Sequence, residues 1–180
     1  MSLRDAWETQ APDWVRWARS PELDDDFWSF HLPEFLRFVP APGRLTADVG
    51  CGEGRLGRVL ARSGHRVVGF DTSPTSVRAA VAEVARVLAP GGRFCVALLH
   101  PVVSAGMVDG YAGERRYSFT VERAGLEMTY EGTHRPLGAY FDALEAAGFV
   151  VEALREPAAL RDDGSSYVNF LHLRGRLLGR

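Results

Sequence analysis

The stretch Ala47-Asp-Val-Gly-Cys-Gly-Glu-Gly-Arg55 is the most informative part of this chain. Three glycines stand at alternate positions directly after the apolar segment Leu45–Val49, which we predict to be a short strand. Glycine permits positive φ angles and lets a ligand lie against bare backbone. The next segment, Arg55–Arg62, is predicted to be a helix whose first N–H groups point at that ligand. The glycines of this loop are Gly50, Gly52 and Gly54.

Strand and helix patterns alternate through the middle of the chain. His65–Phe70 is predicted to be a second strand, which ends at Asp71. Ser73 is a suitable N-cap, and apolar residues spaced four and three apart continue a helix from there to Leu88. Arg93–Leu99 is predicted to be a third strand. This order is typical of an α/β fold with a doubly wound, mostly parallel sheet.

The last part of the chain is less regular. Tyr117–Arg123 and Leu126–Gly132 are predicted to form a hairpin. A helix is expected to begin at Pro136, and two closing strands are expected at Phe149–Leu154 and Tyr167–Leu173.

All four tryptophans lie near the amino terminus, within the first 28 residues. Trp7, Trp14 and Trp17 follow a spacing of seven and then three, which places them on one face of a helix. Two compatible interpretations stay open for this aromatic helical segment. Its rings pack the helix onto the main core, or they form a lid over a ligand cleft.

Length and composition indicate a single globular domain over residues 1–180, with residues 1–44 as an N-terminal helical lid segment and residues 45–180 as the core. The 21 basic residues are all arginine, and with 23 acidic residues they give a net charge of -2. This balance argues against nucleic acid or an anionic membrane as a partner. The absence of lysine excludes Schiff-base chemistry.

The chain is expected to be cytoplasmic. Its longest uncharged stretch, Phe94–Val108, has 15 residues, fewer than the roughly 18–20 that a membrane-spanning helix needs. Asp5 and Glu8 stand where a signal peptide would be basic and then apolar. Cys51 and Cys95 are therefore expected to be reduced thiols.

Two classes of ligand are considered for the glycine loop. Gly52-x-Gly54-x-x-Gly57, with Asp71 nineteen residues after its first glycine, also fits a dinucleotide fingerprint. However, Asp48 and Glu53 flank the loop, and two carboxylates repel a pyrophosphate. They attract a cation instead, and S-adenosylmethionine has an ammonium group, a sulfonium and no phosphate. In that case Asp71 accepts hydrogen bonds from the two ribose hydroxyls.

Several segments, spread over nearly the whole chain, resemble class I S-adenosylmethionine-dependent methyltransferases of the small-molecule type. Asp48–Gly54 resembles motif I of that family, and His65–Pro74 is similar to its second strand and turn. The other similar segments are Val81–Phe94, His134–Tyr140 and Leu144–Phe149.

The resemblance implies a Rossmann-like fold, S-adenosylmethionine as the cofactor, and methyl transfer to a small-molecule acceptor. It implies no metal. The cofactor-binding residues that follow from it are Asp48, Gly50, Cys51, Gly52, Gly54, Asp71, Thr72 and Ser73.

Relative to that family, the chain lacks the segment with the third and fourth strands. Two strands, one helix and their loops amount to roughly 35–45 residues. Either the third strand of this chain lies beside the first in a smaller sheet, or the chain is an internally shortened version of a longer parent. A shortened sheet leaves apolar surface uncovered, so self-association, in its simplest form a homodimer, is expected.

Methyl transfer needs little acid–base machinery unless the acceptor must lose a proton. The candidates for a base are His100 and His134, and each has an alternative structural role. Arg135 either holds an acceptor carboxylate or faces solvent. Two other functions remain as alternatives: a catalytically inactive methyltransferase-like protein that binds a partner, and an NAD-dependent oxidoreductase.

Overall fold

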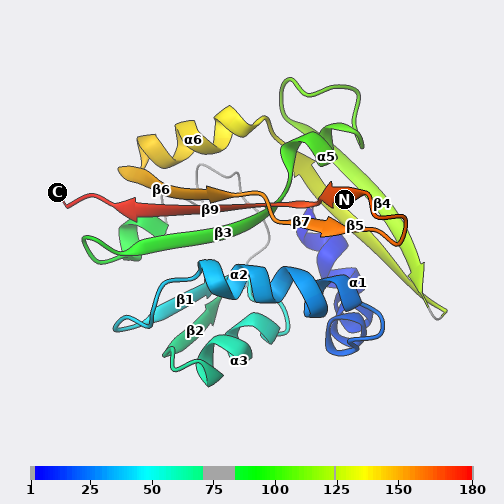
Figure 1. Ribbon diagram of the computed structural model, residues 1–180, viewed down its shortest axis with the longest axis horizontal. Coiled ribbons are helices and arrows are strands. Elements are labelled where there is room, and N and C mark those ends of the chain that lie inside the picture. Colours follow the sequence, from blue (N-terminus) through cyan, green and yellow to red (C-terminus); the bar gives the residue numbers. More distant parts are fainter. Residues whose placement is uncertain (1–2, 71–83, 124, 180) are drawn as a thin grey trace. The chain divides into compact units, whose positions relative to one another are not determined.

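The computed structural model describes residues 3–70, 84–123 and 125–179 (Figure 1). The chain divides into two compact units, which we call the first unit (residues 1–74 and 119–131) and the second unit (residues 75–118 and 132–180). The expected single domain over residues 1–180 stays a prediction. Three expected site residues and most of one expected helix lie outside the described residues. The site residues are Asp71, Thr72 and Ser73.

The first unit begins with the helical segment that the tryptophan spacing predicts. It consists of α1 (Leu3–Arg19), the π-helix η1 (Asp26–His31) and α2 (Leu32–Phe38). The side chain of Trp17 on α1 is only 2% exposed and packs with Leu126 and Met128 of the β4–β5 hairpin. Burial of a side chain of this size contributes roughly 3–5 kcal/mol to stability. Trp17 therefore packs this helix onto the hairpin, which is consistent with the packing interpretation.

The strand–helix–strand order around the glycine loop is also confirmed. The elements are β1 (Thr46–Val49), α3 (Arg55–Arg62) and β2 (Val67–Phe70). The two strands pair in parallel, with Asp48 opposite Gly69. A parallel pair needs a crossover connection, and α3 supplies it.

The predicted hairpin is present and extends two residues further at its open end. Its strands are β4 (Arg115–Arg123) and β5 (Leu126–His134), which lie side by side and run in opposite directions (Figure 1). Gly125 in the turn has a φ of 73°, which favours glycine.

The second unit contains a three-stranded antiparallel sheet in the order β3-β9-β6. Its strands are β3 (Arg93–Leu99), β6 (Phe149–Arg155) and β9 (Phe170–Leu177), and α6 (Leu137–Ala146) lies along one side of β6 (Figure 1). Three shorter elements complete the unit: α5 (Pro101–Ala105), β7 (Ala158–Leu160) and β8 (Ser166–Val168). One closing strand was predicted at Tyr167–Leu173, whereas β8 ends at Val168 and β9 starts at Phe170.

The core of the second unit lies between this sheet and the helices beside it. Leu171 and Leu173 of β9 are almost fully buried against Leu144 of α6 and Phe149 of β6. A Cβ at Gly175 would lie 3.3 Å from the Phe149 ring, so even a small side chain there would crowd that ring. The closing strand therefore packs tightly under α6.

The prediction of a mostly parallel sheet is not confirmed. Among the strands that the structure describes, β1 and β2 pair in parallel, whereas the sheet of the second unit is antiparallel throughout. The expected position of the third strand beside the first stays a prediction; within the second unit, β3 pairs with β9 along all seven of its residues. Strand β9 offers an antiparallel partner of matching length, and a local sequence pattern does not encode that choice.

Apolar side chains remain exposed near β1. Leu45, just before the strand, is 57% exposed, and Val49, its last residue, is 55% exposed. In the described part of the chain, β1 pairs with β2 alone. Over the same residues, no helix is both long and apolar enough to cross a membrane.

Candidate functional site

The loop between β1 and α3 has the backbone that its glycines predict. Gly50, Gly52 and Gly54 have φ angles of 79°, 50° and 84°, all in the region that disfavours residues with a Cβ. The N–H of Gly54 donates to the carbonyl of Cys51 at 2.8 Å, which closes a tight turn. A Cβ added to Gly50 would meet no atom within 4 Å. The loop therefore presents bare backbone to open space at Gly50.

Asp48 lies beneath the loop rather than beside it. The residue is 8% exposed, and a Cβ on Gly57 of α3 would lie 3.3 Å from its Oδ2. The same Cβ would lie 3.4 Å from Val67 on β2. Gly57 therefore allows the close approach of helix and strands that the last glycine of such a motif provides.

Cys51 packs on the second strand. Its Sγ would lie 2.9 Å from a Cβ placed on Gly69, so position 69 tolerates no side chain while Cys51 is there. The thiol is thus part of the packing between loop and strand. Cys51 can contribute to a ligand site through its backbone.

Glu53 is held by two arginines. Its side chain is 2% exposed and accepts hydrogen bonds from Arg58 on both oxygens and from Arg19 on one, each at 2.8 Å. Burial by itself raises the pKa of Glu53, but the hydrogen bonds and charges of these arginines outweigh it and hold the pKa below 4.5. Glu53 is therefore ionised, and its negative charge is balanced by the positive charges of Arg19 and Arg58.

This pairing changes the charge argument made from the sequence. The carboxylates of Glu53 and Asp24 are matched by arginines Arg19, Arg55 and Arg58. The loop is therefore not the acidic cradle that sequence analysis expected. Its selectivity for a cation over a pyrophosphate cannot rest on Glu53.

Arg55, the first residue of α3, joins the loop to the amino-terminal segment. Its guanidinium donates to Asp24 at 2.5 Å and lies 3.4 Å over the Phe27 ring and 5.1 Å over the Trp14 ring. The role of Arg55 at this loop was not predicted from the sequence. One feature of the sequence could have indicated it. Arg55 stands in the first turn of a predicted helix, where the helix dipole favours acidic residues over basic ones.

Trp14 lies against the glycine loop itself. A Cβ on Gly52 would be 3.2 Å from Nε1 and 3.9 Å from Cδ1 of its indole. The Trp14 ring also makes edge-to-face contacts with Trp7 and Tyr130, with ring centroids 5.8 and 6.2 Å away. Part of the aromatic segment thus reaches the predicted ligand site.

His100 belongs to the second unit and caps α5. Its Nδ1 accepts a hydrogen bond from the N–H of Val102 at 3.1 Å, and its Nε2 donates to Glu156 at 2.8 Å. Both ring nitrogens are therefore engaged. The short helix that it caps was not predicted, although a histidine followed by Pro101 at the first helical position was a usable signal.

His134, also in the second unit, is completely buried. Its Nε2 lies 2.8 Å from the carbonyl of Tyr111, so this nitrogen carries the proton and donates it. Its Nδ1 then accepts from the hydroxyl of Ser104, also at 2.8 Å. Arg135, the next residue, is paired with both oxygens of Glu114 at 2.9 Å. The two histidines and Arg135 are thus engaged with protein groups.

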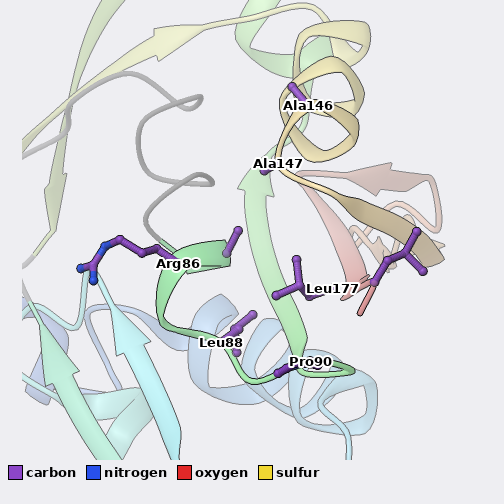
Figure 2. Close-up of a pocket in the computed structure, with 8 residues that line it drawn as sticks. Arg86, Leu88, Pro90, Ala146, Ala147 and Leu177 are labelled. Carbon is purple, nitrogen blue, oxygen red and sulfur yellow. The ribbon is translucent and has the colours of Figure 1, made fainter. Parts of the chain in front are cut away.

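A pocket of about 420 Å³ lies elsewhere in the second unit (Figure 2). Its walls are mainly aliphatic, and the guanidinium of Arg86 points away from Leu177 (Figure 2). It contains none of the candidate site residues. The lining residues include Leu88, Pro90, Ala146, Ala147, Leu177 and Leu178.

Comparison with known proteins identifies relatives of this chain. A family model described as a methyltransferase domain matches residues 47–81. A ubiquinone biosynthesis O-methyltransferase of Methylobacterium sp. (strain 4-46) is 32% identical over 105 residues, which are 58% of this chain and 42% of that protein. The match therefore spans less than half of the relative's length.

Solved structures of methyltransferases have a similar fold. A proposed S-adenosylmethionine-dependent methyltransferase of Listeria monocytogenes superposes with a TM-score of 0.64 at 18% identity, over 82% of this chain and 97% of the other. Burkholderia thailandensis 1,6-didemethyltoxoflavin-N1-methyltransferase, solved with 1,6-didemethyltoxoflavin and S-adenosylhomocysteine, gives 0.56 at 14% identity, over 99% and 92%. These structural matches confirm the Rossmann-like character of the fold, and the family-model match to residues 47–81 supports the resemblance to methyltransferases.

Proposed function

We propose that this protein binds S-adenosylmethionine on its glycine loop and transfers the methyl group to a small-molecule acceptor. The observation that carries the proposal is the left-handed backbone of Gly50, Gly52 and Gly54 at the carboxyl end of the parallel strand β1. This loop lies in the part of the chain that the methyltransferase-domain model matches.

The shape of the loop fits this cofactor. The backbone at Gly50 faces open space, and the nearest atoms to a Cβ on Gly52 belong to the Trp14 indole. We assign the contacts to the backbone of Gly50, Cys51, Gly52 and Gly54, with Asp48 supporting the loop from below. Asp71, Thr72 and Ser73 are proposed as further cofactor ligands because of the family resemblance.

The cofactor supplies an activated methyl group on a positively charged sulfur. The task of the protein is then to hold two reactants in line and to keep water away from them. The N-terminal segment contributes to both through its contacts with the loop. Trp14 covers Gly52, while Arg19 and Arg55 bind the segment to Glu53 and α3.

We assign proton transfer to neither histidine. His100 and His134 each use both ring nitrogens in hydrogen bonds to the protein, so neither can take a proton from an acceptor without losing one of them. The proposed reaction therefore does not use His100 or His134 as its base. The relatives support a small molecule, since one is named for ubiquinone biosynthesis and another for 1,6-didemethyltoxoflavin.

A catalytically inactive binding protein is the second candidate. It is favoured by the engagement of both histidines and by the missing segment, and it predicts cofactor binding without methyl transfer. Calorimetric titration of the full chain with S-adenosylmethionine, S-adenosylhomocysteine and NAD tests the cofactor. A radioactive-methyl assay with phenolic and amine acceptors then tests transfer. Heat with NAD alone would overturn the proposal, and binding without transfer to any acceptor would favour the inactive protein.

A further inference from the structure

We propose that Trp14 is itself a ligand-binding residue, whose indole N–H donates a hydrogen bond to an oxygen of the molecule on the glycine loop. This inference rests on the proposed function and deepens it. The acceptor oxygen belongs either to a ribose hydroxyl or to a carboxylate, because the proposed cofactor has both.

The orientation of the Trp14 ring is the first observation. Its Nε1 is the atom nearest to a Cβ placed on Gly52, at 3.2 Å, and Cδ1 follows at 3.9 Å. The polar edge of the indole thus faces the loop. A ligand lying against the Gly52 backbone has to meet this N–H.

The second observation is that the indole N–H is available. In the described part of the chain, the contacts of the Trp14 side chain are with rings and with the Arg55 guanidinium, and none is a hydrogen bond to an oxygen. An indole N–H can only donate a hydrogen bond, so its partner must be an acceptor. A ligand oxygen beside Gly52 supplies one.

The third observation is that the Trp14 ring is held in place. Arg55 stacks over it at 5.1 Å, and Asp24 fixes that guanidinium with an ion pair whose side chains are 14% and 18% exposed. Trp7 and Tyr130 contact the ring from α1 and β5. A donor that is fixed before the ligand arrives loses little freedom on binding. Arg55 and Asp24 are therefore positioning residues for Trp14.

Trp7 provides a matched control. It lies on the same helix and in the same aromatic cluster, but its ring contacts are with Trp14 and Tyr130, not with the loop. Replacement of either tryptophan by phenylalanine keeps an aromatic ring and removes the N–H. A packing role predicts similar effects for both changes, whereas a ligand contact predicts an effect for Trp14 alone.

The test uses the full chain labelled with ¹⁵N and the indole N–H signals of its four tryptophans. The signal that disappears in Trp14→Phe identifies Trp14. Saturating S-adenosylhomocysteine should move that signal downfield more than the Trp7 signal. Trp14→Phe should weaken binding about 3- to 10-fold, the range of one hydrogen bond, and Trp7→Phe less than about 2-fold.

Methylthioadenosine, which retains the ribose and lacks the carboxylate, distinguishes the two acceptor oxygens. If it moves the Trp14 signal equally, the ribose accepts the hydrogen bond; if it does not, the carboxylate does. An unmoved Trp14 signal in protein saturated with S-adenosylhomocysteine would overturn the inference and leave the proposed function standing. Absence of any binding to the wild-type chain would overturn the proposed function, and the inference with it. The wild-type spectrum decides the question even if Trp14→Phe fails to fold, with Trp7→Phe then used to identify signals by elimination.

Discussion

Glu53 accepts hydrogen bonds on both carboxylate oxygens from Arg58, each at 2.8 Å, across one turn at the start of α3. Arg19 of α1 adds a third hydrogen bond to the same carboxylate. Since Glu53 itself is almost completely buried, this single side chain ties the glycine loop both to its own helix and to the amino-terminal segment. The loop is thereby held in shape before any ligand binds.

Glu53→Gln should lower the free energy of unfolding by about 1–2 kcal/mol. Hydrogen bonds to a charged group contribute about 1.5–3 kcal/mol, and the exposure of Arg19 and Arg58 reduces that value. Urea denaturation followed by circular dichroism measures the change. Glu22→Gln is the control, because Glu22 is exposed. Equal stabilities of the two variants would show that the Glu53 cluster contributes nothing.

The contribution of Glu53 should also depend on pH. Its pKa is lower in the folded protein than its ordinary value of 4.5, so its stabilisation is complete above that value and is lost as the pH falls through the lowered pKa. The difference in unfolding free energy between wild type and Glu53→Gln should therefore be constant near neutral pH and shrink below about pH 4. A difference that grows on acidification would contradict the assignment.

Gly52→Val should abolish binding of S-adenosylmethionine. The φ of Gly52 is 50°, which a β-branched residue avoids, and its Cβ would lie 3.2 Å from the Trp14 indole. The added side chain would also fill the space over the loop. Calorimetry measures the loss, and Gly43→Ala, whose Cβ would meet nothing within 4 Å, is the control. Retained affinity in a folded Gly52→Val variant would remove the loop from the cofactor site.

Asp71→Ala should weaken binding of the same cofactor by about 1.5–3 kcal/mol, the range for hydrogen bonds to a charged acceptor. The expectation rests on its place directly after β2, seventeen residues beyond Gly54. Asp142→Ala, an exposed change on α6, should leave affinity unchanged. Equal dissociation constants for the two variants would exclude Asp71 from the site.

The chain is expected to self-associate and to bind the cofactor weakly, with a dissociation constant above about 10 μM. Leu45 and Val49 are more than half exposed around β1, and burial of such side chains contributes about 1.5–3 kcal/mol each. Sedimentation should detect a dimer, and Leu45→Glu should weaken it about tenfold or more. A stable monomer whose dissociation constant for the cofactor is micromolar or lower would contradict this expectation.

Local patterns predicted the neighbourhood of the loop well. Glycine spacing and apolar periodicity are local properties, and α3 spans Arg55–Arg62 as predicted, while β1 and β3 lie where expected. The pairing of β3 with β9 was not predicted, because it joins segments about 80 residues apart in the chain. The neutralisation of Glu53 was missed for the same reason, since Arg19 lies 34 residues away in the chain.

The catalytic candidates show a second limit of prediction from sequence. His100 and His134 stand at element ends, as site residues often do, but their hydrogen-bond partners come from other elements. Glu156 is 56 residues from His100, and Ser104 is 30 residues from His134. Whether a histidine is available for proton transfer therefore depends on tertiary contacts that no motif contains.

Backbone amide signals of the glycine loop provide the most direct test of where the ligand binds. The ¹⁵N-labelled full chain is titrated with S-adenosylmethionine, and the shifts of Gly50, Gly52 and Gly54 are compared with those of residues around the aliphatic pocket, such as Leu88 and Leu177. The proposed function predicts saturable shifts at the three glycines, little change at the pocket, and no comparable effect of NAD. Shifts confined to the pocket, or glycine shifts that NAD produces and S-adenosylmethionine does not, would contradict it.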